Sequence, residues 1–193
     1  MSKTIHLIRH GQSTANAGFA ETGLDPGVVD ARLSQLGEEQ VRQTHHLLAG
    51  SHYDLIVASP LTRAIQTASG IFAGRNTTPM IIESTHRELL GNTGDKGRAV
   101  SSLKADFPHL DFGHLSDVWW YTEGDVDHRG LHVEPLEVML HRIEVFKLWL
   151  AKRPEQRIAV VGHGLFFYHM TGVQFENCQL HVWQVRIPDH LVN

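Results

Sequence analysis

Short apolar runs recur along the chain at lengths typical of β-strands. Four of them lie at residues 4–8, 54–59, 79–83 and 157–164, and a fifth lies at 180–187. The inner runs are continuously apolar rather than alternating, as in "DLIVAS" and "RIAVVGHG". Continuous apolar runs of this length are typical of strands that are covered on both faces of a sheet.

Between these runs, apolar residues return at helical spacing, and we expect helices over 33–50, 61–74, 97–108 and 134–154. Ser34 is the expected N-cap of the first helix and Gly50 its stop signal. Its expected apolar stripe consists of Leu36, Val41, Leu47 and Leu48. The longest helix carries its stripe at Leu136, Leu140, Ile143, Phe146 and Leu150.

Strands that alternate with helices predict an α/β fold: a three-layer sandwich with a mostly parallel central sheet and helices on both faces. The 193 residues favour a single domain over 1–193. An irregular insertion at about 92–135 interrupts the alternation and includes Trp119, Trp120 and Tyr121. These aromatic residues either pack inside the insertion or form a lid over a site.

Composition excludes several classes of partner. The formal net charge is −4, so there is no overall basic field that would attract nucleic acid. No apolar run approaches the roughly 20 residues needed to cross a bilayer, and we expect no membrane partner. The single cysteine, Cys178, excludes an internal disulfide and is typical of a cytoplasmic protein.

Three of the strand runs end in polar turns: "LIRHG", "IVASPLTR" and "AVVGHG". In parallel sheets the ligand lies beyond the carboxyl ends of the strands. We therefore expect Arg9, His10, Arg63 and His163 to meet at one edge of the sheet.

This set of side chains suits phosphoryl transfer. A neutral imidazole nitrogen can attack phosphorus, and forked guanidinium groups match the equatorial oxygens of the transferred group. A second histidine, when protonated, adds another donor. Gly11 and Gly164, which follow the two histidines, let the backbone approach the phosphoryl group without interference from a Cβ atom.

The motifs "LIRHGQSTAN", "LSQLGEEQ", "SPLTRAIQTA", "VVGHG" and "NCQLHVWQV" resemble, in order, those of the histidine phosphatase superfamily. That group includes the cofactor-dependent phosphoglycerate mutases and many small phosphatases. The resemblance runs from about residue 4 to 187 and is weakest between 92 and 135. It implies a phosphoglycerate mutase-like fold.

The resemblance also implies roles for individual residues. His10 would be the phosphorylated nucleophile, and Arg9, Arg63 and His163 would bind the phosphoryl group, with Asn16 as a further polar contact. The family performs this cycle without a metal or an organic cofactor. The implied activity is a metal-independent phosphoric monoester hydrolase of the histidine acid phosphatase type.

The proton donor of the family is usually a glutamate that follows an apolar strand, and "STHRELLG" offers Glu88 in that place. Asp95 in "GNTGDKG" is the alternative acid, since some subgroups carry an acidic residue there. His86 and Arg98 are candidate substrate contacts near the acid.

Mutases hold a second anionic group with a basic segment, whereas "KADFPHLDFGHLSDVWWYTEGDVDH" is acidic and aromatic. We therefore expect hydrolysis of a small-molecule phosphomonoester. Two alternatives remain open: a phosphotransferase of the phosphoglycerate mutase type, and a phosphate-binding or interaction module with little turnover.

Overall fold

The central element of the fold is a five-stranded sheet with the strand order β3-β2-β4-β1-β5. The computed structural model describes residues 3–184. The strands are β1 (Thr4–Arg9), β2 (Leu55–Ala58), β3 (Met80–Ile82), β4 (Arg157–Gly162) and β5 (Leu180–Gln184). Neighbouring strands pair in parallel except β5, which runs antiparallel to β1. The expected mostly parallel sheet is confirmed, and residues 185–187 of the last expected strand lie outside the described residues.

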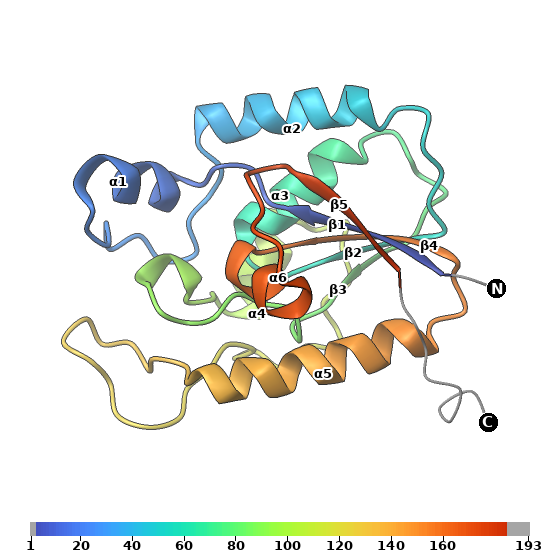
Figure 1. The fold of residues 1–193 in the computed structure, drawn as a ribbon. Helices are drawn as coiled ribbons and strands as arrows, with labels where there is room; N and C mark the ends of the chain where they lie inside the picture. The colour runs from blue at the N-terminus through green and yellow to red at the C-terminus, as the bar shows by residue number, and fades with distance from the viewer. Residues whose placement is uncertain (1–2, 185–193) are drawn as a thin grey trace.

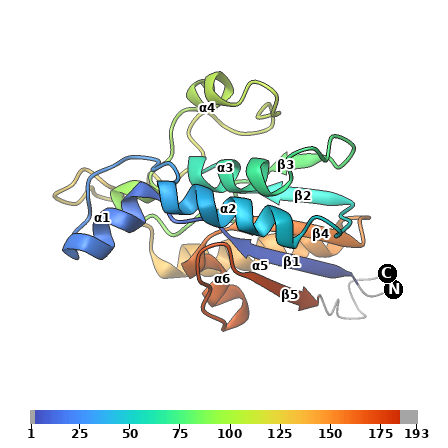
Figure 2. The same ribbon diagram turned by 90° about the horizontal axis from the view of Figure 1, so that it is seen from above.

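Helices cover both faces of this sheet, so the three-layer arrangement is confirmed (Figure 1). The helices are α1 (Thr14–Thr22), α2 (Gln35–Leu47), α3 (Thr62–Ile71), α4 (Val100–Asp106), α5 (Leu136–Lys152) and α6 (Gly164–Thr171). Helices α2 and α3 lie on one face, and α5 and α6 lie on the other (Figure 1). Figure 2 shows α4 beyond the β3 side of the sheet.

Alternation along the strands divides the core between the two faces. In β1, Ile8 packs with the α2 and α3 side, whereas Ile5 and Leu7 pack with the α5 and α6 side. Because a strand side chain points to the opposite face from its neighbour, a run that is apolar at every position fills both cores. Phe146 and Phe166 anchor the second core and are fully buried.

Helix α2 begins as expected, with the Ser34 side chain accepting a hydrogen bond from the Gly37 amide at 3.1 Å. Its expected stripe is wrong at two positions, because Leu36 and Leu47 are exposed. The buried face instead carries Gly37, Val41 and Thr44. Each exposed leucine is offset from that face by about one residue, roughly 100° of helix rotation.

The same offset occurs in α5 at Leu140, which is exposed next to the buried Met139. Leu136 is exposed at the first position of the helix, although it lies two turns before the buried Ile143 on the same side. Ile143, Phe146 and Leu150 face the core as expected.

Two helices were not expected from the sequence. Helix α1 contains no buried residue, and Ser13 and Asn16 cap its start reciprocally. Helix α6 is apolar around most of its circumference and ends at Gly172, whose φ of 78° favours glycine. Neither helix has the one-sided apolar stripe from which a helix is recognised.

The insertion at 92–135 packs by its aromatic residues. Trp119 is buried in the core on the α2 and α3 side, and its indole N–H donates to the Arg98 carbonyl at 3.0 Å. Trp120 packs against that core. These contacts favour the packing alternative for the two tryptophans. Within residues 3–184, no helix combines the length and the apolar character that crossing a membrane requires.

Candidate active site

The carboxyl ends of the four parallel strands meet at one cavity of about 300 Å³. His10 follows β1, Arg63 lies in the first turn of α3 after β2, Glu88 follows β3, and His163 follows β4. The structure therefore brings together residues that are separated by up to 153 positions in the chain. The cavity is lined by Arg9, His10, Asn16, Arg63, Glu88, Leu89, Gly91, Asn92, Asp95, Gly164 and Leu165.

Two neighbours determine which nitrogen of His10 carries the proton. Nδ1 lies 2.7 Å from the Gly11 carbonyl oxygen, so Nδ1 must donate. Arg63 Nε donates to His10 Nε2 at 3.0 Å, so Nε2 carries a lone pair. Burial, and then the nearby Arg63 charge, hold the pKa of His10 well below its usual range. The ring is therefore neutral at pH 7, with Nε2 as the basic nitrogen.

His163 lies beside His10, with the ring centroids 5.2 Å apart. Its Nε2 lies 2.7 Å from the Ser59 hydroxyl, and its Nδ1 is 3.4 Å from an Arg63 NH2 group. Burial and then Arg63 hold the pKa of His163 well below its usual range. Because Arg63 can only donate, Nδ1 of the neutral ring accepts, and the proton lies on Nε2, which donates to the Ser59 hydroxyl.

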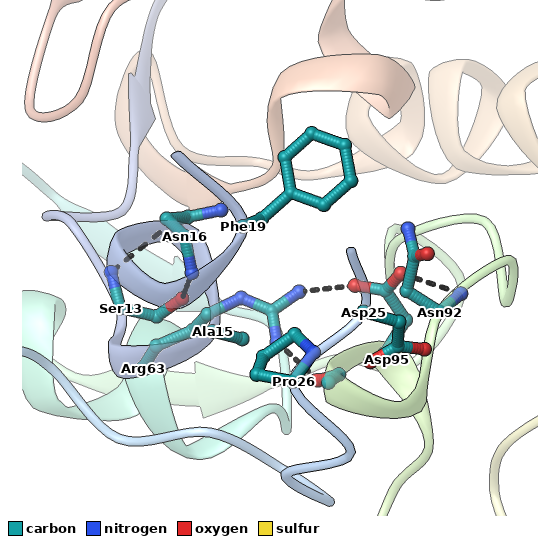
Figure 3. Close-up of a pocket in the computed structure, with 10 residues that line it drawn as sticks. Ser13, Ala15, Asn16, Phe19, Asp25, Pro26, Arg63, Asn92 and Asp95 are labelled. Carbon is teal, nitrogen blue, oxygen red and sulfur yellow. Dashed lines mark hydrogen bonds and ion pairs between the residues drawn. The ribbon is translucent and has the colours of Figure 1, made fainter. Parts of the chain in front are cut away.

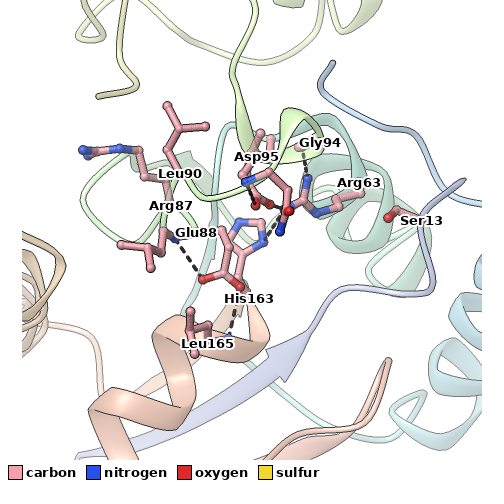
Figure 4. A network of polar contacts seen from close by, with 12 residues as sticks. Ser13, Arg63, Arg87, Glu88, Leu90, Gly94, Asp95, His163 and Leu165 are labelled. Atoms are coloured by element: carbon pink, nitrogen blue, oxygen red, sulfur yellow. Dashed lines mark hydrogen bonds and ion pairs between the residues drawn. The ribbon is translucent and has the colours of Figure 1, made fainter. Parts of the chain in front are cut away.

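Arg63 is at the centre of a polar network (Figure 4). Besides its bond to His10, it donates to the Gly94 carbonyl at 2.6 Å and to Asp95 Oδ1 at 2.8 Å. Both members of the ion pair with Asp95 are largely buried, with side chains 4% and 15% exposed. Arg63 thus lies at the strand ends as expected, and the Asp95 carboxylate occupies part of its guanidinium fork.

Arg9 reaches the same cavity from the end of β1. It donates to the Phe175 carbonyl at 2.6 Å, and its buried Nε has no partner among the described residues. Gly164 makes room for this side chain, because a Cβ atom there would lie 3.1 Å from Arg9 Nε. We expected glycine at position 164 because it lets the backbone approach a phosphoryl group. The structure gives a second reason for glycine there, which is space for the Arg9 guanidinium group.

Gly11 is also required by packing. A Cβ atom at Gly11 would lie 2.8 Å from the Gly37 carbonyl oxygen, and one at Gly37 would lie 2.1 Å from the Gln12 carbonyl oxygen. Helix α2 therefore contacts the turn after β1 backbone to backbone. This contact fixes the position of the His10 main chain.

Glu88 follows β3, and its side chain points to the N-terminus of α6. Its carboxylate accepts hydrogen bonds from the backbone amides of Leu165 and Phe166, each at 3.0 Å (Figure 4). Burial, and then the negative charge of Asp95, raise the pKa of Glu88. A carboxyl group with a raised pKa that faces a cavity next to a neutral imidazole is suited to proton transfer.

Asn16 lines both this cavity and an adjoining one of about 140 Å³ (Figure 3). Its side-chain oxygen accepts from the Ser13 amide at 3.2 Å, which leaves the amide NH2 group to contact a ligand. Phe19 and Asp25 form other parts of the smaller cavity.

Sequence reasoning missed Asp30, a buried carboxylate that holds the start of α3. Asp30 accepts from the Thr62 amide at 2.7 Å, where Leu61 at the N-cap has no side chain that could do so. Arg98 Nε donates to the same carboxylate at 2.8 Å. The expectation that Arg98 contacts substrate is therefore wrong in this structure, since ion pairs with Asp30 and Asp106 engage it.

His86 is also not in the cavity. Its ring is fully buried, stacks on Phe146 with centroids 4.6 Å apart, and lies 3.1 Å from the Val161 carbonyl oxygen through Nε2. Burial lowers the pKa of His86 to about 4. Its position is that of a core histidine rather than of a substrate contact.

A second network missed from the sequence secures the segment that carries Glu88. The buried Glu134 carboxylate receives two hydrogen bonds from Arg142, both 2.8 Å long, and one of 3.0 Å from Arg87. Arg142 also donates to the carbonyls of Thr85 and Arg87. Arg87 therefore pairs with Glu134 and not with its neighbour Glu88, whose carboxylate is left to face the cavity. We name this set the Glu134–Arg142 clamp.

Comparison with known proteins agrees with this geometry. The sequence model of the histidine phosphatase superfamily (branch 1) matches residues 5–190. Phosphoglycerate mutase-like protein 1 of Arabidopsis thaliana is 30% identical over 99% of this chain and 78% of its own length. Glucosyl-3-phosphoglycerate phosphatase of Mycolicibacterium vanbaalenii is 28% identical over 84% of this chain and 69% of its own.

Among solved structures, the α-ribazole phosphatase of Shigella flexneri superposes with a TM-score of 0.65 at 22% identity. The superposition covers 93% of this chain and 89% of that one, and at this identity it speaks for the fold alone. The family match, the order of the strands and the histidines and arginines gathered at their ends agree. The chain belongs to the histidine phosphatase superfamily, branch 1.

Proposed function

We propose that this protein is a phosphatase that hydrolyses a small-molecule phosphomonoester through a phosphohistidine on His10 Nε2. The observation that carries the proposal is the protonation state of His10. The Gly11 carbonyl holds the proton on Nδ1 at 2.7 Å, and the Nε2 lone pair accepts from Arg63 Nε at 3.0 Å. When Arg63 turns its N–H groups to the phosphoryl oxygens, this lone pair is free to attack phosphorus.

In the first step, His10 Nε2 attacks phosphorus and the bond from phosphorus to the leaving alkoxide oxygen breaks. Arg9 and Arg63 neutralise the charge on the equatorial oxygens. When the Arg63 NH2 group turns from His163 Nδ1 to the phosphoryl group, His163 takes the tautomer with the proton on Nδ1, Ser59 donates to Nε2, and Nδ1 donates to a phosphoryl oxygen. Glu88 gives its proton to the alkoxide, which leaves as the alcohol. The raised pKa of Glu88, caused first by burial, increases the protonated fraction of this carboxyl group and so favours its role as the acid.

In the second step, water attacks phosphorus and the bond from phosphorus to Nε2 breaks. Glu88, now ionised, takes the proton of the water, and inorganic phosphate leaves. Both His10 and Glu88 return to their starting protonation states. The cycle therefore needs no group beyond those of the chain and water.

The charge of the cavity favours hydrolysis over mutase chemistry. Arg9 and Arg63 are the cations of its lining, and the transferred phosphoryl group occupies both. The remaining charged residues of the two adjoining cavities are Glu88, Asp95 and Asp25. A leaving group with a second phosphate or a carboxylate would meet like charge there, which is unfavourable in a partly buried site.

The first experiment detects the covalent intermediate. Wild-type protein and His10→Ala are mixed with p-nitrophenyl phosphate and analysed by rapid mass spectrometry without acid. We expect a transient gain of one phosphoryl group in the wild type and none in the variant. Nitrophenol release by both proteins without an adduct would overturn the nucleophile assignment. Phosphate binding without an adduct or product would favour the binding-module alternative.

The second experiment tests the acid. Glu88→Gln loses about 10²-fold or more in kcat/KM on an alkyl phosphate, whose leaving group needs a proton, and much less on p-nitrophenyl phosphate. Glu83→Gln is the matched control, because Glu83 accepts hydrogen bonds from Thr85 and is outside the cavity lining. Equal losses of Glu88→Gln on both substrates would transfer the role to Asp95.

A further inference from the structure

The ion pair between Arg63 and Asp95 raises a question that the proposed mechanism does not answer. Asp95 Oδ1 sits 2.8 Å from the guanidinium group that would bind the phosphoryl oxygens. Its other oxygen accepts from the Asn92 amide at 3.3 Å, which fixes the carboxylate at the cavity wall. A carboxylate of the protein thus stands where a phosphoryl oxygen would form its ion pair with Arg63.

A charge count shows what happens when a phosphoryl group enters. Asp95 is faced by Arg63 from α3, by Glu88 from the segment after β3, and by Asp25 from the loop after α1. Arg9 and His10 line the same cavity, His163 lies behind it at 3.4 Å from Arg63, and both histidines are neutral. Asp25 has its own cation in Arg129, at 2.8 Å.

Two cations, Arg9 and Arg63, therefore face three groups that can carry negative charge: Glu88, Asp95 and the entering phosphoryl group. A phosphoryl dianion that takes Arg9 and Arg63 leaves an ionised Asp95 buried without a cation, next to the dianion. An unpaired buried carboxylate of this kind is costly, and a proton removes the cost. Burial raises the pKa of Asp95, whereas its pair with Arg63 acts in the opposite direction. Displacement from Arg63 therefore raises it further.

Resting on the proposed phosphoryl pocket, we propose that Asp95 is a specificity-determining residue that competes with the phosphoryl group for Arg63 and is displaced only together with uptake of one proton. The proton arrives on Asp95 or on the phosphoryl group itself, so the site selects phosphoryl groups of lower net charge. The same competition promotes release of dianionic product, because Asp95 regains Arg63 as the proton leaves.

The test uses tungstate at submillimolar concentration, so that it does not condense with uptake of protons and stays a monomeric dianion between pH 5.5 and 8.5. Its dissociation constant is measured by isothermal titration calorimetry on the full chain, in buffers of different ionisation enthalpy that report proton uptake. For the wild type we expect uptake approaching one proton and affinity that weakens about tenfold per pH unit above the pKa of Asp95. In Asp95→Asn, uptake falls to near zero, and binding at pH 8 is tighter than in the wild type.

Asp25→Asn is the matched control. Asp25 lines the adjoining cavity but pairs with Arg129, so this variant retains the wild-type pH dependence. Glu88→Gln shows which of the two carboxyl groups in the cavity, Asp95 or Glu88, takes up the proton. We expect this variant to take up as much proton as the wild type. If Asp95→Asn folds poorly, Asp95→Ser is a second variant that removes the negative charge at this position.

Four results would overturn the inference. Loss of proton uptake in Glu88→Gln would assign the proton to Glu88. Weaker tungstate binding by Asp95→Asn at every pH would make Asp95 a support for Arg63, and unchanged uptake in that variant would remove Asp95 from the linkage. Absence of tungstate binding in the wild type would overturn the phosphoryl pocket as well. Proton uptake through Asp95 in a protein that forms no adduct would leave this inference standing and the proposed hydrolysis wrong.

Discussion

Replacing Arg142 by methionine tests the Glu134–Arg142 clamp. Methionine keeps a long side chain on α5 but removes both hydrogen bonds to Glu134 and those to the carbonyls of Thr85 and Arg87. The Glu134 side chain is 0% exposed, so water cannot replace the lost donors. Glu134 keeps Arg87 and the amide of Leu90 as partners.

The expected magnitude follows from these contacts. Breaking a buried ion pair on one side costs about 3–5 kcal/mol. Arg87 still compensates part of the Glu134 charge, so we expect a loss of about 2–4 kcal/mol in the free energy of unfolding. That is a large share of the roughly 5–15 kcal/mol that stabilises a typical domain. Lys147→Met is the matched control on the same helix, because it breaks an exposed ion pair with Glu144 and should cost about 0.5 kcal/mol or less.

Urea unfolding followed by tryptophan fluorescence and circular dichroism gives both free energies at pH 7. A second readout follows from the position of Glu88 in the segment that the clamp holds. Arg142→Met should lower kcat/KM on an alkyl phosphate more than on p-nitrophenyl phosphate, as Glu88→Gln does. Equal unfolding free energies for Arg142→Met and Lys147→Met would refute the reasoning about the clamp. A large stability loss with unchanged substrate preference would limit its role to stability.

Two further predictions concern the site and the core. Arg63→Lys should lower kcat/KM by about 10²-fold or more at unchanged fold, since one ammonium group cannot replace a fork that contacts His10 and the phosphoryl oxygens together; a near-normal rate would exclude Arg63 as a phosphoryl ligand. The pKa of His86 is lowered to about 4 in the fold, against about 6.5 in an unfolded chain, so the unfolded state binds more protons between these values. The stability contributed by neutral His86 is complete above pH 6.5 and is lost as the pH falls toward 4. Urea midpoints across this range should decline less steeply in His86→Gln than in the wild type, and identical slopes would contradict the assignment.

The sheet was predictable because its strands are apolar at nearly every position and are punctuated by turns. The helix that starts at Ser34 was predictable from its cap, whereas the face it buries was not. Leu36 and Leu47 fit a stripe in the sequence, but α2 contacts the turn after β1 through Gly37, and this glycine contact sets the rotation of the helix. Helix α1 has no buried residue and therefore leaves no periodic signal.

The gathering of Arg9, His10, Arg63 and His163 was predictable because each follows or ends a parallel strand. The partners of these residues were not, since pairs such as Arg63 with Asp95 or Thr62 with Asp30 join loops whose paths depend on packing. Glu134 precedes Pro135 between elements, and a lone carboxylate there carries no sequence signal of burial. Sequence spacing identifies groups at strand ends, whereas loop-borne carboxylates are located only by the fold.

The strand order has a consequence for synthesis of the protein. Strand β1 pairs with β4 and β5, and β2 reaches β1 only through β4, which lies between them. Until residues 157–184 have left the ribosome, β1 has neither β4 nor β5 to pair with. Such long-range pairing is slow, and the unpaired apolar strand is exposed to aggregation and to chaperones in the meantime. His10, the proposed nucleophile, is among the first residues to be made, but the strand that carries it gains its neighbours only near the end of synthesis.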